Sequence, residues 1–553
     1  MHVRKQAAVL AAGLVCLSAI VAAQEAVDLA VVDRIKSEAT ANSQVMDLLR
    51  EMTDVHGPRL TGSPGFEDAA KWAVERLTGF GIGNVHLERW GPFGRSWSAE
   101  SASVEMLAPR YARLDATPLA WSAPTAGAIT GEPLLAPVDF GFFSPKKLAD
   151  DFEAYRRKWS GKLRGRIVLF TPVKPLPSRD SALFHRYTDS ELADIAKAPD
   201  PAKAPRVTRI DDLPWPDRPE DVGKMFNALP EALIDALIDR YEELGKVRAK
   251  FFADEGAAAI LMGDDRAREG LLAAEAAGPY RARDPLAPAT FVVTAEQYGR
   301  LARLVEQKQP VRIRVELKAT ASRDDVDGEN IVGEIPGGAK RDEVVMVGAH
   351  FDSWHSGTGA TDNGAGSAVM IEVMRILKSL NLKLDRTVRI ALWSGEEQGL
   401  FGSRAYVKAH FAEPATMQPR DEHAKLSGYF NLDNGSGKIR GVYLQEHEAM
   451  RPLFEQWLAP FRDLGVTTIS IRNTGGTDHL SFVAVGLPGF QFIQDPLDYE
   501  TVTHHTSADT YDHAVAADLM QASAVIASVV YDAANRPERL PRRALPAAVP
   551  PIK

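Results

Sequence analysis

The chain has 553 residues, of which 45% are hydrophobic and 25% are charged, a balance typical of globular proteins. This length exceeds what a single hydrophobic core supports, so we expect two or more domains. The net charge of −9 excludes the strongly basic surface that binding to nucleic acid or to an anionic membrane would require.

Residues 1–23 have the pattern of a secretory signal peptide. A basic pair precedes an apolar stretch at 7–21, which ends in small residues before the polar Gln24. The stretch is short for a bilayer span of about 20 residues, so we expect cleavage after Ala23 and no stable membrane anchor. Cys16 is the only cysteine, so the mature, exported chain, periplasmic or secreted, would contain no disulfide and no cysteine nucleophile.

The segments after residue 24 differ in their local sequence pattern. Helical spacing predicts helices at 43–51 and about 67–77, joined by a turn at 57–65 that is rich in Gly and Pro. From 114 to about 317, short β-like pieces stand between Pro, Gly and Ala, which indicates a separate module; the pieces are 165–170, 257–261 and 290–293.

A Pro- and charge-rich block at about 175–252 lies inside this module. Residues 175–230 carry most of the prolines and charges, and 231–252 has the pattern of a charged helix. Such a block suits either a lid or a solvated insertion, and we favour the solvated insertion.

From Asn330 onward, strands and helices alternate in the way that is typical of a mostly parallel sheet covered by helices on both faces. The first strand, 344–349, runs into His350 and Asp352. In a His-x-Asp pair, the carboxylate can orient the ring and leave the other nitrogen free for a metal, so we assign Asp352 this supporting catalytic role.

More candidate ligands follow in chain order. Asp362 opens a helix, and the pair Glu396 and Glu397 follows an apolar strand at 387–393. Alone, Asp362 would be interpreted as a helix N-cap, but its nearness to a strand-end histidine favours a metal ligand. Of the glutamates, we assign Glu397 to metal and Glu396 to general base.

Two later segments complete the set. Asp433 follows the strand around 429–432, and His504 and His505 stand in a late loop. Taken singly, Asp433 would be a turn residue and the histidines part of a surface loop. Because parallel strands deliver such residues to one edge of a sheet, the constellation predicts a metal-dependent hydrolase.

These motifs resemble the M28 family of zinc exopeptidases. The residues that carry the resemblance are His350-Phe351-Asp352-Ser353-Trp354, Asp362-Asn363-Gly364, Leu392-Trp393-Ser394-Gly395-Glu396-Glu397-Gln398-Gly399, Gly476-Thr477-Asp478, Val485-Gly486-Leu487-Pro488-Gly489 and the turn at 57–63. They are most similar to the plasma glutamate carboxypeptidase (carboxypeptidase Q) branch, whose members act as dipeptidases and aminopeptidases.

The resemblance implies an α/β fold: a mostly parallel-sheet catalytic domain, arranged as an α/β/α sandwich, with an inserted, β-rich protease-associated domain. The implied divisions are 24–113 for the first part of the catalytic domain, 114–325 for the insert, 326–535 for the main catalytic part and 536–553 for a Pro/Arg-rich tail. The block at about 175–252 has no assigned counterpart in the family.

The resemblance also implies the site. Asp362 would bridge two zinc ions, with His350 and Asp433 on one ion and Glu397 and His505 on the other. Family spacing selects His505 over His504. The Asp362-Asn363 bond would be cis. Imidazole and carboxylate also accept Mn²⁺ or Co²⁺.

The leading function is therefore a secreted zinc exopeptidase that hydrolyses peptides or dipeptides at a free amino terminus, with Glu396 as base to a metal-activated water. A carboxypeptidase, a glutaminyl cyclase and a non-catalytic module like the transferrin-receptor ectodomain remain alternatives. A homodimer is left open. Trp354, Tyr443 and Tyr499 are candidates for substrate contact, although aromatic residues usually serve packing.

Overall fold

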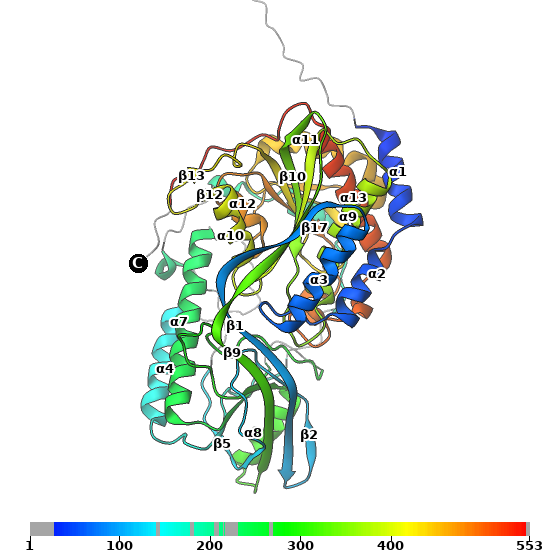
Figure 1. The fold of residues 1–553 in the computed structure, drawn as a ribbon. Coiled ribbons are helices and arrows are strands. Elements are labelled where there is room, and N and C mark those ends of the chain that lie inside the picture. Colours follow the sequence, from blue (N-terminus) through cyan, green and yellow to red (C-terminus); the bar gives the residue numbers. More distant parts are fainter. Residues whose placement is uncertain are drawn as a thin grey trace, which may run out of the picture.

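The computed structural model describes residues 27–139, 144–176, 182–203, 209–213, 215, 231–264 and 269–548. The signal peptide expected at 1–23 lies outside these residues. In Figure 1 the described chain forms an upper body around a large sheet and a lower part around a smaller sheet, joined by two long strands. The expected domain boundaries stay predictions.

The amino-terminal helices are α1 (Leu29–Ala41), α2 (Val45–Arg50), the π-helical turn η1 (Glu51–Val55) and α3 (Pro64–Gly79). Both predicted helices are present. The second begins earlier than expected because the Ser63 side chain accepts a hydrogen bond from the Phe66 amide at 3.2 Å and Pro64 occupies the first turn, where its missing N–H costs nothing.

The large sheet is mixed. Its strands are β1 (Gly83–Ala108), β2 (Ala112–Leu114), β4 (Ile129–Gly131), β9 (Arg312–Ile335), β10 (Lys340–His350), β11 (Arg386–Trp393), β14 (Leu426–Asn431), β15 (Ile439–Tyr443), β16 (Thr468–Ser470) and β17 (Gly489–Gln494). Their order is β16-β15-β17-β14-β10-β11-β9-β1-β2, and β4 also pairs with β9. The centre, from β17 to β11, is parallel as expected, whereas β9 and β1 form a long antiparallel ribbon that descends into the lower part (Figure 1).

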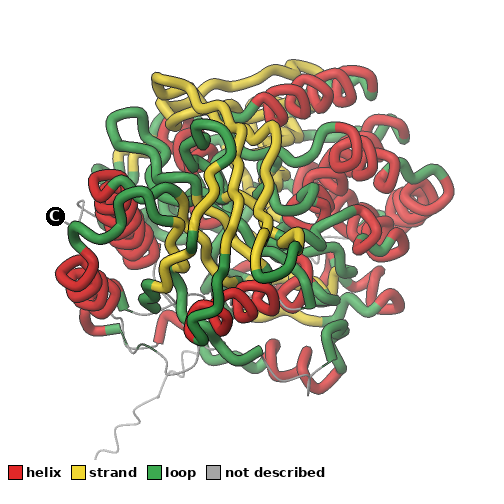
Figure 2. The backbone as a smooth tube through the Cα atoms, turned by 90° about the horizontal axis from the view of Figure 1, so that it is seen from below, coloured by secondary structure: helices red, strands yellow, loops and turns green. Residues whose placement is uncertain are grey.

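Helices cover both faces of the sheet, as Figure 2 shows from below. They are α9 (Ala365–Ser379), α10 (Phe401–His410), α11 (Arg451–Trp457), α12 (His479–Val483) and α13 (Ala516–Asn535). Strand alternation separates the two cores: Val345 and Val347 pack with α9 and α13, and Met346 packs on the opposite face with α10 and α12. Among the described helices, none has the length and apolar character to span a membrane.

Smaller elements lie in the upper body and in the insert between β2 and β9. They are β12 (Ala412–Glu413), β13 (Gln418–Pro419), the π turns η5 (Ala360–Gly364) and η8 (Tyr499–Thr503), and the 3₁₀ turns η2 (Pro201–Lys203), η3 (Ile210–Asp212), η6 (Glu448–Met450), η7 (Ala459–Leu464) and η9 (Tyr511–His513). The turn η5 contains the candidate ligand Asp362, and η8 ends directly before His504 and His505.

The lower part is an insert between β2 and β9 with its own sheet. Its strands are β3 (Ala116–Pro118), β5 (Pro133–Leu135), β6 (Ile167–Leu169), β7 (Ala259–Gly263) and β8 (Thr290–Val293), in the order β3-β8-β7-β6-β5. Its helices are α4 (Pro145–Trp159), α5 (Asp189–Ala196), α7 (Glu231–Glu255) and α8 (Ala295–Glu306). The strands β6, β7 and β8 lie where the sequence predicted them, and the protease-associated identity of the insert stays a prediction.

The described residues of the 175–252 block are only partly solvated, and its interpretation as a solvated insertion stays a prediction. The helix α7 buries Leu237 and Phe252 in the insert. Arg186 reaches the upper body, where it pairs with Asp495 at 3.0 Å and Asp518 at 2.7 Å. The charges that suggested solvation therefore include groups that join the block to the rest of the molecule.

Candidate metal centre and active site

The candidate ligands meet at the carboxyl edge of the parallel strands. His350 is the last residue of β10, Glu396 and Glu397 follow β11, and Asp433 follows β14. Because these three strands are parallel neighbours, their carboxyl ends open on the same edge of the sheet. Asp362, within η5, closes the group from the loop before α9.

A first cluster forms around His350. Its Nε2 lies 3.3 Å from Asp362 Oδ1 and 3.3 Å from Asp433 Oδ1, and the three side chains are buried. Burial opposes protonation of His350, but the charges of Asp433 and Glu396 outweigh it and hold the His350 pKa well above its usual value. The imidazole thus lies in a strongly negative electrostatic environment.

A second cluster forms around His505. Its Nε2 lies 3.0 Å from Glu397 Oε2 and 3.2 Å from Asp362 Oδ2. Asp362 therefore presents one carboxylate oxygen to each cluster and stands between them. The Asp362-Asn363 peptide bond is cis, as the resemblance implied.

The neighbouring histidine lies farther away. His504 Nε2 is 3.8 Å from Asp362 Oδ2, and its Nδ1 is 3.8 Å from Glu500 Oε2. The side chain of His504 is 37% exposed and that of His505 is 17% exposed. Although both rings lie near Asp362, only His505 reaches Glu397 among the described contacts, which favours it over His504.

Glu396 lines the same cavity without joining either histidine cluster. Burial raises the pKa of Glu396 well above its usual value; His350 acts against this shift, and the charges of Asp433 and Asp478 add to it. A buried carboxylate with a raised proton affinity is the kind of group that accepts a proton in general base catalysis.

Asp352 supports the site by a different contact from the expected one. The His350 Nδ1 lies 3.0 Å from the backbone carbonyl of Asp352, whereas the Asp352 carboxylate oxygen Oδ1 is 3.7 Å away. The same Oδ1 accepts a hydrogen bond from the Glu396 amide at 3.3 Å. The Asp352 carboxylate therefore faces the loop that carries Glu396.

Sequence reasoning missed two supporting residues in the 57–65 turn. The Thr61 hydroxyl donates to Asp352 Oδ2 at 2.8 Å and accepts from the Gly395 amide at 2.8 Å. The fully buried Arg59 guanidinium donates to the carbonyls of Phe351, Thr358 and Gly359 at 2.7, 2.9 and 2.8 Å. The sequence predicts a turn rich in Gly and Pro at 57–65, but no local signal connects it to loops almost 300 residues away.

A further missed residue, Asp509, holds the backbone around Asp362. Its carboxylate accepts hydrogen bonds from the Thr361 amide at 2.5 Å and the Thr361 hydroxyl at 2.8 Å. It also accepts from the Asp362 amide at 3.2 Å. Family spacing used this acidic residue only to choose between the two histidines, so its contact with the η5 backbone is a finding of the structure.

The clusters open into a cavity of about 290 Å³. Besides the candidate ligands and Glu396, its lining residues are Ile238, Gln398, Gly399, Leu400, Arg404, Gly476, Leu480, Tyr499 and His504. Of the aromatic candidates, Tyr499 lines the cavity, Trp354 packs against the His505 ring at 6.2 Å, and Tyr443 is not among the lining residues. Ile238 belongs to α7, so the insert contributes to the wall.

The donor set fits bound metal ions. Three carboxylates and two imidazoles converge at the site, and mutual repulsion among the carboxylates would be relieved by cations. Among the described residues, none donates a hydrogen bond to the buried Glu397 Oε1. Oxygen and imidazole nitrogen ligands suit zinc and related divalent ions.

Comparison with known proteins is consistent with this geometry. Residues 330–530 match the model of peptidase family M28. Carboxypeptidase Q of Mus musculus is 25% identical over 492 residues, which cover 89% of this chain and 86% of the mouse protein. Aminopeptidase YwaD of Bacillus subtilis (strain 168) is 29% identical over 243 residues, 43% of this chain and 50% of that protein.

Two solved structures share the fold. A Peptidase M28 precursor from Shewanella amazonensis SB2B has a TM-score of 0.63 at 24% identity, over 94% of this chain and 98% of that one. BSAP, a zinc aminopeptidase from Bacillus subtilis, has a TM-score of 0.54 at 19% identity, over 89% and 95% of the two chains. At these identities the likeness concerns the architecture.

Proposed function

We propose that this chain, a metallopeptidase with a peptidase family M28 domain, is a two-zinc exopeptidase that acts on peptides or dipeptides with a free amino terminus. The observation that carries the proposal is the position of Asp362. One of its carboxylate oxygens faces His350 and the other faces His505, which is the arrangement expected of a ligand shared by two ions.

In this proposal Asp362 would be shared by both ions, His350 and Asp433 would hold one of them, and Glu397 and His505 would hold the other. The name of BSAP, a zinc aminopeptidase, and the imidazole and carboxylate donors support zinc, while Mn²⁺ and Co²⁺ suit the same ligands. When bound, zinc supplies a Lewis acid that polarises the scissile carbonyl and lowers the pKa of a water toward about 7.

In this proposal Glu396 transfers the proton. It accepts a proton from the attacking water as the new carbon–oxygen bond forms, and it delivers a proton to the amine as the carbon–nitrogen bond breaks. Its amide is held by Asp352, and Thr61 ties Asp352 to the Gly395 amide next to the base. These contacts fix the loop from which Glu396 reaches the cavity.

A dipeptidase or carboxypeptidase action is the second candidate. Arg404 lines the cavity together with the candidate ligands, and its positive charge is complementary to the free carboxylate of such a substrate. The names of the carboxypeptidase Q relatives point in the same direction. The glutaminyl cyclase alternative has less support, because both histidine clusters of a two-ion site are present.

The test is product analysis by mass spectrometry on matched peptides with free, amino-blocked or carboxyl-blocked ends. We expect loss of the first residue, abolished by amino blocking and by a zinc chelator, and about two zinc ions per chain by elemental analysis. Cleavage that is limited to dipeptides and stopped by either block would establish the dipeptidase. Turnover that resists full removal of metal would contradict the proposal.

A further inference from the structure

We propose that Glu275, which the insert supplies, is a positioning residue that orients His505 for metal binding. The inference rests on the proposed function, in which His505 is a zinc ligand. It assigns the insert a part in building the metal site itself, in addition to covering the catalytic domain.

The contact is direct. Glu275 Oε1 lies 2.7 Å from His505 Nδ1, while the other ring nitrogen, Nε2, faces Glu397 and Asp362. The carboxylate therefore selects the tautomer with the proton on Nδ1 and leaves the Nε2 lone pair directed at the metal position. A carboxylate in this place also makes the imidazole a stronger ligand.

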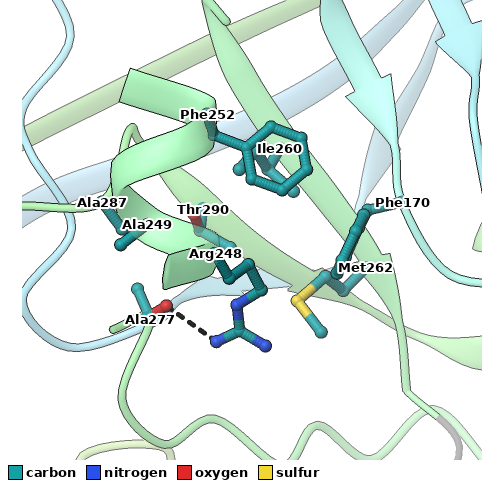
Figure 3. A pocket seen from close by; sticks show the side chains of 9 residues that line it. All are labelled: Phe170, Arg248, Ala249, Phe252, Ile260, Met262, Ala277, Ala287 and Thr290. Carbon is teal, nitrogen blue, oxygen red and sulfur yellow. Dashed lines mark hydrogen bonds between the residues drawn. The ribbon is translucent and has the colours of Figure 1, made fainter. Parts of the chain in front are cut away.

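The segment that carries Glu275 is held on the insert side. The Ala120 amide donates to the Glu275 carbonyl at 2.9 Å, and the Ala277 amide donates back to the Ala120 carbonyl at 2.9 Å. Arg248 of α7 donates to the Ala277 carbonyl at 2.9 Å, as Figure 3 shows. The pocket drawn there measures about 10 Å³, which is room for one water at most, so its use is packing.

The same segment is also held on the catalytic side. The Ala274 amide donates to Ser356 Oγ at 2.8 Å, and Leu272 exchanges hydrogen bonds with Ser507, at 3.1 Å to its hydroxyl and 2.8 Å from its amide. The segment thus touches the loop after His350 and the loop after His505. Glu275 is fixed between two anchored neighbours, which limits how far its carboxylate can move.

His505 needs such a support more than His350 does. Its backbone has a φ of 60°, in the left-handed region, and it stands in a loop, whereas His350 ends a buried central strand. The Nδ1 partner of His350 is a carbonyl two residues away, while that of His505 is a carboxylate 230 residues away in the insert. The two halves of the proposed site therefore depend on different parts of the chain.

The experiment compares zinc affinity and the Co²⁺ absorption spectrum in the wild type, Glu275→Ala and Glu275→Gln. The control is Glu306→Gln, which changes an exposed glutamate at the end of α8 in the same insert. Because the Glu275 side chain is 38% exposed, we expect Glu275→Ala to weaken one of the two ions about tenfold, the low end of the range for such supporting residues.

Glu275→Gln should fall between the wild type and Glu275→Ala, because its amide oxygen can still accept from Nδ1 without the charge. It also keeps the test valid if the alanine variant does not fold. The Co²⁺ bands should shift in both variants and stay unchanged in the control. Wild-type zinc affinity and spectrum in both Glu275 variants would overturn this inference alone, whereas a wild type that binds no metal would overturn the proposed function and this inference with it.

Discussion

The two histidines of the candidate site are held by different regions of the molecule. His350 belongs to the central strand β10, is fully buried and is surrounded by the loops that Arg59 and Thr61 tie together. His505 belongs to a loop after η8 and is oriented from the insert. One half of the site is therefore preorganised by the sheet, and the other half by contact between the sheet body and the insert.

This difference shows that a single site can have two sources of stability. Strand ends are placed by hydrogen bonding across the sheet and by the core on both of its faces. A loop residue that depends on packing between two modules shifts when either module shifts. Variants in the two regions should therefore separate metal affinity, catalysis and global stability.

The largest effect is expected for Glu396→Gln. The change keeps the shape of the side chain but removes the proton acceptor, so kcat should fall about a thousandfold, within the range for general base catalysis. Both zinc ions should remain, because Glu396 belongs to neither histidine cluster. The measurement is steady-state kinetics with zinc analysis, and near wild-type turnover would remove Glu396 from the role of base.

The second prediction is that Arg59→Met destabilises the loops that follow His350. The carbonyls of Phe351, Thr358 and Gly359 would lose their buried donor. Since an unsatisfied buried acceptor costs about 1 to 3 kcal/mol, we expect unfolding free energy to fall by about 3 kcal/mol or more. Urea denaturation measures it, and an unchanged midpoint would show that these loops are held by other contacts.

The third prediction concerns how much stability the upper body loses in acid. Burial, with the charge of Arg543 adding, lowers the pKa of His447 to about 4, against about 6.5 in an unfolded chain. Between these values the unfolded state binds more protons, so this stability is present above about pH 6.5 and is lost as pH falls toward 4.

From pH 7 to pH 5 the loss attributable to His447 should be about 2 kcal/mol. His447→Phe keeps a ring beside Phe490 and removes the titration. Denaturation of both proteins at the two pH values checks this, and equal pH dependence in variant and wild type would exclude His447 as the source.

The smallest effect is expected on the insert side, for Gly278→Ala. An added Cβ would lie 2.9 Å from the Ala249 Cβ of α7, so the segment that carries Glu275 would shift. We expect a cost of about 1 to 2 kcal/mol and a small loss of zinc affinity. Gly245→Ala is the matched control on α7, since a Cβ there meets no described atom within 4 Å and alanine favours helix by up to about 1 kcal/mol.

Comparison of Gly278→Ala with Gly245→Ala shows whether the insert affects metal binding. If Gly278→Ala lowers zinc affinity and Gly245→Ala does not, the position of the 272–277 segment matters to the metal site. If both variants keep wild-type zinc affinity while Gly278→Ala is destabilised, the insert and the metal site are energetically independent at this contact.

Much of the fold and the candidate ligand set was predictable from the amino-acid sequence. Apolar strands that end in His350, in the Glu396-Glu397 pair and near Asp433 are local patterns, and parallel pairing brings such ends together. The strands β6, β7 and β8 and the helix α7 were also predictable from local pattern.

The long ribbon of β1 and β9 was not predicted. Its residues mix buried, half-buried and exposed positions without one regular period, although Ile313, Val315 and Leu317 are buried between more exposed neighbours, and register shifts interrupt the pairing at several points. A regular alternation over only part of each strand does not give the length of the ribbon or its partner, because pairing between two strands more than 200 residues apart stabilises it.

The chain by itself thus determined which residue types gather at the carboxyl edge of the sheet, because local periodicity and strand order are written in neighbouring residues. The tertiary structure alone decided that Arg59 and Thr61 support the sheet side, that Ile238 and Arg404 line the cavity and that Glu275 faces His505. The physical reason is that these contacts join segments far apart in the chain, and their geometry exists only once both modules have folded and packed.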